Sequence, residues 1–177
     1  DLIAGSVTLF PQEPEIFENT IAYNITLGLP YENAEIASIC QTVHFTDVLA
    51  QLPKGLSSNI VERGVNLSGG QKQRLALARG LFAARDNEII LLDEPTSSVD
   101  PKTESRIYER MFAEMGDKVV VSALHRLHLL TRFDYVYVLS QGKVVDQGTL
   151  TELLDKSTIF RELWAHQEDL RPEWRPS

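Results

Sequence analysis

The sequence predicts an α/β protein in which a mainly parallel sheet carries an inserted helical segment. Residues 6–10 have the pattern of a strand, and residues 16–84 are mostly helical in pattern. From residue 88 onward the order is strand, helix, strand, strand. This order is typical of a layered domain built on parallel strands. We therefore interpret the helical first half as an insertion on that layered domain.

The helical segment contains three stretches with amphipathic spacing. Apolar residues recur at helical intervals over residues 33–40 and 45–52. The third stretch, residues 71–84, places Leu75 and Ala78 on one apolar face. We expect this third helix to be well buried.

The second half opens with a continuous apolar run of branched residues at 88–92, which predicts a strand buried on both faces. Asp100 and Pro101 supply a strong helix start, because Asp caps a helix and Pro fits its first position. Strands at 118–123 and 134–140 follow, then a hairpin partner at 143–147 and a capping-box helix start at 149–152.

Composition bounds the classes of function. The 177 residues are 43% hydrophobic and 24% charged, which is typical of a globular domain able to bury a core. No apolar run reaches the roughly 20 residues that a membrane helix needs. The net charge of −8 argues against nucleic acid as the main partner. The single cysteine, Cys40, excludes an internal disulfide and is best interpreted as a small buried apolar side chain.

Two adjacent carboxylates, Asp93 and Glu94, directly follow the apolar strand at 88–92. The carboxyl edge of a parallel sheet is where α/β proteins bind ligands. Mg²⁺ prefers one or two carboxylates together with water and phosphate oxygens, so Asp93 is a candidate metal ligand. Glu94 could orient or deprotonate a water molecule. The alternative is an acidic pair that merely caps the following structure.

The segment Leu67-Ser68-Gly69-Gly70-Gln71 stands immediately before a predicted helix. Ser68 can cap that helix, and the two glycines let the backbone approach a ligand closely. Free N–H groups and the positive end of the helix dipole favour a phosphate there. The alternative is an ordinary cap with a flexible loop.

Two further polar residues follow predicted strands. Gln12 lies at the end of the first strand, where its amide could contact a metal or water. His125 follows the strand at 118–123, in a position from which it could reach a phosphate. Taken singly, each could equally be a structural residue.

Together, these motifs and their order resemble the nucleotide-binding domain of ATP-binding-cassette (ABC) transporters. The resemblance rests on the signature Leu67–Gln71, the acidic segment Leu91–Pro95, the loop Ser97–Asp100, and the flanking Gln12 and His125. It implies a P-loop NTPase, RecA-like core with an inserted ABC helical subdomain. It also implies ATP and Mg²⁺ as ligands.

The resemblance implies a role for each candidate residue. Gln12 matches the glutamine that contacts Mg²⁺ and the attacking water. Asp93 matches the Walker B aspartate that holds the metal, and Glu94 matches the catalytic base. His125 matches the switch histidine on the γ-phosphate of ATP.

Other matched residues imply contacts between two copies of the domain. The signature residues Ser68, Gly69, Gly70 and Gln71 would bind the γ-phosphate of ATP held by the opposite protomer. Ser98 and Asp100 match the loop that communicates across this head-to-tail dimer. Positioning and charge stabilisation by such groups is what phosphoryl transfer requires.

The resemblance extends to the exporter subtype. Residues 14–25 are similar to the segment that type I exporters present to their transmembrane helices, and Glu62-Arg63-Gly64 is similar to an exporter X-loop. We therefore expect the chain to power efflux at the cytoplasmic face of a plasma or inner membrane, through a transmembrane domain outside this chain. The expected divisions are core strand and Q-loop glutamine at 1–12, helical subdomain at 13–85, core at 86–170, and tail at 171–177.

One family motif is absent from the sequence. The phosphate-cradling G-x-x-x-x-G-K-[ST] loop should precede Gln12, and no such motif occurs. We therefore expect a fragment that lacks the N-terminal strands and the P-loop, and that is inactive in isolation although its parent protein is an ATPase. Two alternatives stay open, namely a natural non-hydrolysing paralogue and the head domain of a chromosome-maintenance or DNA-repair ATPase.

Overall fold

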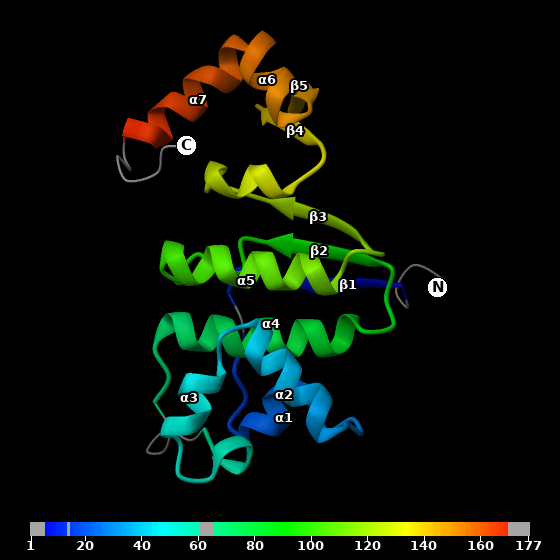
Figure 1. Cartoon of the computed structure of the whole chain (residues 1–177), viewed down its shortest axis with the longest axis vertical. Coiled ribbons are helices and arrows are strands. Elements are labelled where there is room, and N and C mark those ends of the chain that lie inside the picture. Colours follow the sequence, from blue (N-terminus) through cyan, green and yellow to red (C-terminus); the bar gives the residue numbers. More distant parts are fainter. Residues whose placement is uncertain (1–5, 14, 61–65, 170–177) are drawn as a thin grey trace. The chain divides into compact units, whose positions relative to one another are not determined.

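The computed structural model describes residues 6–13, 15–60 and 66–169. It divides the chain into two compact units, one ending at Ala123 and the other starting at Leu124. Each unit has its own sheet (Figure 1). The expected X-loop at 62–64 and the expected tail at 171–177 lie outside the described residues.

The first unit is built on a three-stranded parallel sheet in the order β1–β2–β3 (Figure 1). Its strands are β1 (Val7–Phe10), β2 (Ile89–Asp93) and β3 (Val119–Ala123). Parallel strands need a crossover connection, and between β2 and β3 the helix α5 (Pro101–Glu114) supplies it. The predicted parallel sheet is confirmed, and so are the three strands that form it.

The two faces of this sheet differ in burial. Phe10, Ile90 and Leu92 point to the face that the helices cover, and each is at most 2% exposed. On the other face the register aligns Leu9 with Leu91 and Leu91 with Val121. Leu9 and Val121 are more than half exposed and Leu91 is only half-buried. The prediction that residues 88–92 are buried on both faces is therefore wrong for the described part of the chain, because an apolar run does not specify what covers it.

The helical segment between β1 and β2 is confirmed. It contains α1 (Ile21–Thr26), α2 (Asn33–Thr42), α3 (Thr46–Gln51), the 3₁₀ turn η1 (Gly55–Ser57) and α4 (Gly69–Ala84). The helix α4 is the long buried one, and it packs against both α1 and β1. It begins at Gly69, two residues before the predicted start, because Ser68 caps it.

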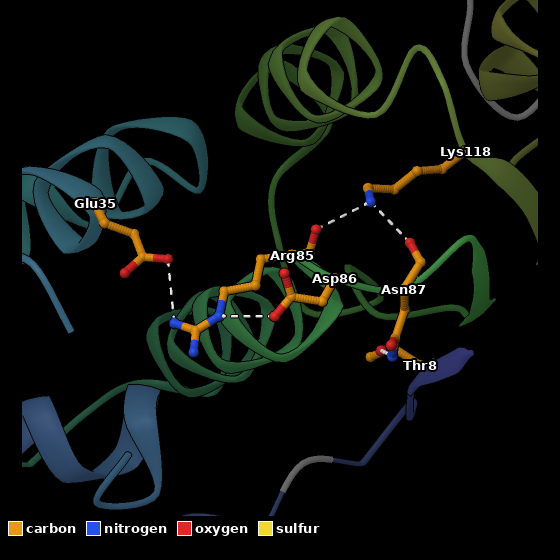
Figure 2. Close-up of polar contacts among 6 residues, drawn as sticks. All are labelled: Thr8, Glu35, Arg85, Asp86, Asn87 and Lys118. Atoms are coloured by element: carbon orange, nitrogen blue, oxygen red, sulfur yellow. Dashed lines mark hydrogen bonds and ion pairs between the residues drawn. The ribbon is translucent and has the colours of Figure 1, made fainter. Parts of the chain in front are cut away.

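A polar network ties the start of the sheet to the helices (Figure 2). The Arg85 guanidinium contacts carboxylate oxygens of Glu35 on α2 and of neighbouring Asp86, at 3.3 and 3.4 Å. The Lys118 ammonium donates to the carbonyls of Arg85 and Asn87, and the Asn87 amide donates to the Thr8 hydroxyl on β1 at 2.6 Å. These contacts fix the turn that follows α4, at the end of the sheet opposite the candidate site.

The second unit consists of a hairpin and short helices. Its elements are η2 (Leu127–Arg132), β4 (Val136–Ser140), β5 (Lys143–Gly148), α6 (Leu150–Lys156) and α7 (Thr158–Asp169). The predicted antiparallel hairpin is confirmed, and its turn at Gln141 and Gly142 has φ values of 47° and 73°. The predicted capping box is also confirmed, since Thr149 and Glu152 bond reciprocally.

Candidate functional site

The N-terminus of α4 carries the signature segment. The Ser68 hydroxyl accepts a hydrogen bond from the Gln71 N–H at 3.2 Å, and the Gln71 side chain accepts one from the Ser68 N–H at 2.8 Å. This capping box confirms the predicted cap. Ser68 and Gly69 are exposed, so the positive end of the helix dipole faces solvent, where it can attract an anion.

The loop that follows β2 packs directly on this helix start. A Cβ added to Gly70 would lie 2.8 Å from the carbonyl oxygen of Ser98, which is closer than real Cβ contacts. Only glycine therefore permits this approach between α4 and the loop. Gly69 is less constrained, since its added Cβ would lie 3.7 Å from the Ser98 Cβ.

In the described part of the chain, the two segments line a cavity of about 480 Å³ that is open to solvent. Its lining comes from the start of α4 and from the loop before α5. The lining residues are Ser68, Gly69, Gly70, Gln71, Arg74, Ser98, Val99 and Asp100. The structure thus brings together every signature and loop residue that the sequence predicts for the dimer-facing surface.

Asp100 also starts the helix α5. Its carboxylate accepts a hydrogen bond from the Thr103 N–H at 3.0 Å, which confirms the predicted Asp-Pro start. This backbone hydrogen bond, assisted by the Thr103 hydroxyl, holds the pKa of Asp100 below its usual value of 3.8. Asp100 therefore stays ionised at neutral pH.

The acidic pair and Gln12 lie along one sheet edge. Phe10 and Leu92 are paired across β1 and β2, so Asp93, the last residue of β2, and Gln12, two residues after β1, lie at the carboxyl ends of adjacent strands. Asp93 and Gln12 are exposed. Glu94 has a left-handed backbone with φ of 44°, a conformation that is uncommon for this residue type and is often found at functional sites.

His125 lies in the second unit, two residues after the end of β3. Its side chain is exposed, and its carbonyl accepts a hydrogen bond from the side-chain amide of Gln167 on α7. The same amide accepts from the Leu127 N–H at 2.9 Å, so α7 holds the segment that carries the histidine. The other candidates all belong to the first unit.

Two residues near the site were not predicted from the sequence. Arg74 lines the cavity, forms an ion pair with Asp47 at 3.5 Å, and donates to the His44 carbonyl. Gln73 is 5% exposed and links Gln12 to the loop after β2. No sequence signal distinguishes them, because the four consecutive polar residues from Gln71 to Arg74 do not indicate which of them is buried.

Comparisons with known proteins identify the family of the chain. A family model described as ABC transporter matches residues 2–97, which is more than half of the chain. The chain belongs to the ABC transporter family. Members of this family generally act as ATPases and use ATP, usually with Mg²⁺.

Curated ABC transporters are similar over most of the chain. The ATM1-type heavy metal exporter of Novosphingobium aromaticivorans is 36% identical over 166 residues, covering 93% of this chain and 27% of the exporter. The mitochondrial iron-sulfur clusters transporter ATM1 of Yarrowia lipolytica is 34% identical over 169 residues, covering 95% of this chain and 24% of that protein. The chain therefore spans about a quarter of the length of these ABC relatives.

A solved structure of an ABC exporter has the same fold. It is the structure of a bacterial Atm1-family ABC exporter with ATP bound, with a TM-score of 0.83 and 34% sequence identity. The match covers 93% of this chain and 29% of the exporter chain. In the described part of this ABC chain, no helix is both long and apolar enough to span a membrane.

Proposed function

We propose that this chain is the ATP-binding and ATP-hydrolysing part of an ABC exporter and that it powers efflux of a substrate across a membrane. The observation that carries the proposal is the cavity shared by the start of α4 and the loop at 98–100. This cavity combines a capped helix N-terminus, two glycines and the Arg74 cation, which together suit a phosphate.

Recognition of the nucleotide follows from this arrangement. The N–H groups of the first turn of α4 and the Ser68 hydroxyl bind the γ-phosphate of ATP held by a second copy in a head-to-tail dimer. Gly70 keeps that turn in contact with Ser98, whose loop meets the same partner copy. ATP bound at this surface therefore indicates that the two copies have closed into the dimer.

Hydrolysis uses the sheet edge. Glu94 acts as the general base on the attacking water, Gln12 orients that water, and His125 contacts the γ-phosphate. An exposed carboxylate at the carboxyl end of a parallel strand suits Mg²⁺, so Asp93, together with Gln12, would hold the ion that neutralises phosphate charge.

We also propose that the chain works with a transmembrane domain and that its divisions have separate roles. A transmembrane domain contacts the helical subdomain at 13–85 through the segment around α1, and the divisions at 1–12 and 86–170 carry the groups for hydrolysis. The chain then works at the cytoplasmic face of the plasma or inner membrane. The names of the exporters that it resembles support the pairing with a transmembrane domain.

The test substitutes Glu94→Gln in the full-length protein. We expect ATP turnover to fall by on the order of 100-fold or more, several kcal/mol in barrier, because the base is lost. ATP-dependent dimerisation should persist. Glu88→Gln is the matched control, since Glu88 is exposed and lies just before β2, at the other end of that strand. Unchanged hydrolysis by the Glu94 variant would contradict the assignment.

A further inference from the structure

Gln73 is a buried polar residue inside the helix α4. Its side chain is 5% exposed, although the neighbouring Lys72 is exposed and Arg74 is half-buried. Burying a primary amide is costly unless its hydrogen-bonding groups are satisfied. Its partners therefore identify what the burial stabilises.

All the amide partners lie on segments far away in the sequence. The Gln73 carbonyl oxygen accepts from the Ser98 N–H at 2.7 Å. The Gln73 amide nitrogen donates to the Ser97 hydroxyl at 2.8 Å and to the Gln12 carbonyl at 3.2 Å. One side chain thus joins α4, the loop after β2 and the segment after β1.

The orientation of this amide follows from its partners. The Ser98 N–H can only donate and the Gln12 carbonyl can only accept, so oxygen and nitrogen of Gln73 cannot be exchanged. Both hydrogens of the amide nitrogen have an acceptor. No other side chain of similar size offers one acceptor and two donors from a neutral planar group.

We propose that Gln73 is a positioning residue that locks the signature helix, the loop at 97–98 and the Gln12 segment into one body. The inference rests on the proposed function, because these three segments carry the phosphate-binding and water-orienting groups. With the lock in place, a displacement of Gln12 moves the loop and the start of α4 together. Without the hydrogen bonds of Gln73, the three segments can shift independently of one another.

Two substitutions distinguish the hydrogen bond that Gln73 accepts from the two that it donates. Gln73→Leu removes all three hydrogen bonds at similar volume. Gln73→Glu, when ionised, keeps the acceptor for the Ser98 N–H and loses both donors. Leu77→Ala is the control for stability alone, since Leu77 is 1% exposed on the same helix and Leu-to-Ala changes destabilise a buried site.

The first readout is amide exchange of Ser98 in the full-length protein. Gln73→Leu should speed this exchange by roughly 10-fold or more, because the amide loses its acceptor. Gln73→Glu should leave it near the wild-type rate, and Leu77→Ala should not raise it selectively. Equal exchange rates of the Ser98 amide in the wild type and in Gln73→Leu would show that Gln73 does not hold this loop, and would overturn the proposal.

The second readout is ATP hydrolysis by the same full-length variants. Both Gln73 variants should lower kcat by about 10-fold with KM for ATP nearly unchanged, since small displacements of positioned groups slow chemistry. Wild-type kcat in Gln73→Leu, or an equal loss in Leu77→Ala, would overturn the positioning role. Absence of hydrolysis by the wild type would instead contradict the proposed function, and the exchange experiment would still decide whether the lock exists.

Discussion

Gly80 has a hydrogen atom in place of a side chain, and this absence of a Cβ lets α4 approach the sheet closely. The Phe10 ring at the end of β1 lies over this glycine, and an added Cβ would come within 2.3 Å of a ring carbon. Phe10 is 2% exposed, so its ring has little space to move into. The position of β1 on α4 therefore depends on the absence of a side chain at residue 80, and Gln12 follows directly from that strand.

We predict that Gly80→Ala destabilises the protein by about 1–3 kcal/mol, because overpacking forces the Phe10 ring or the strand to shift. Denaturant unfolding of the intact protein would measure the change. Gly116→Ala is the matched control, since an added Cβ there meets nothing within 4 Å. A Gly80→Ala variant at least as stable as the wild type would contradict the prediction.

At the scale of single elements, helix starts are controlled by local chemistry. Ser68, Asp100 and Thr149 each accept a hydrogen bond from an N–H in the first turn of α4, α5 and α6. Each of these starts was predictable, because a cap acts over three residues of sequence. The same local control applies to the hairpin turn at Gln141 and Gly142.

We predict that Asp100→Ala lowers the free energy of unfolding by about 1 kcal/mol at neutral pH, because α5 loses its cap. The pKa of Asp100 is lowered on folding, so its contribution is complete above the usual value of 3.8 and is lost as the pH falls through the lower folded value. The difference between wild type and variant should shrink in acid.

Unfolding curves measured across this pH range would check both statements. Asp100→Asn is the control for the cap, because an amide oxygen also accepts the Thr103 N–H and does not titrate. A pH-independent difference between wild type and Asp100→Ala would contradict the carboxylate account.

At the scale of the whole molecule, each unit displays apolar surface. In the first unit the open sheet face exposes Leu9, Val119 and Val121, each above 50%. In the second unit the hairpin exposes Tyr137 and Leu139, the latter at 70%. Apolar patches of this kind commonly mark interfaces.

We predict that residues 1–177, prepared alone, associate reversibly with increasing concentration through the open sheet face. Sedimentation velocity would measure the association. The triple variant Leu9→Thr, Val119→Thr, Val121→Thr should shift it to higher concentration. Val120→Thr is the control, since Val120 points to the other face of β3. Association that is unaffected by the triple variant would exclude this face as the contact.

Only some features of the candidate site could be predicted from the sequence. The cap at Ser68, the two carboxylates at the end of β2 and the Asp-Pro helix start could be predicted because each depends on neighbouring residues. The contact of Gly70 with Ser98, and the links from Gln73 to Gln12 and Ser98, could not be predicted. Between 25 and 61 residues separate the partners of the Gln73 links, and periodicity carries no information at that range.

The amino-acid sequence alone determined the order of the main strands and helices, the capping residues of three helices and the family, because these follow from local spacing and from motifs contiguous in the chain. Only the tertiary structure decided which face of the sheet stays open, which polar side chain is buried, and which loops share a cavity. The physical reason is that burial and hydrogen-bond satisfaction are properties of segments brought together by packing, so no single segment encodes them.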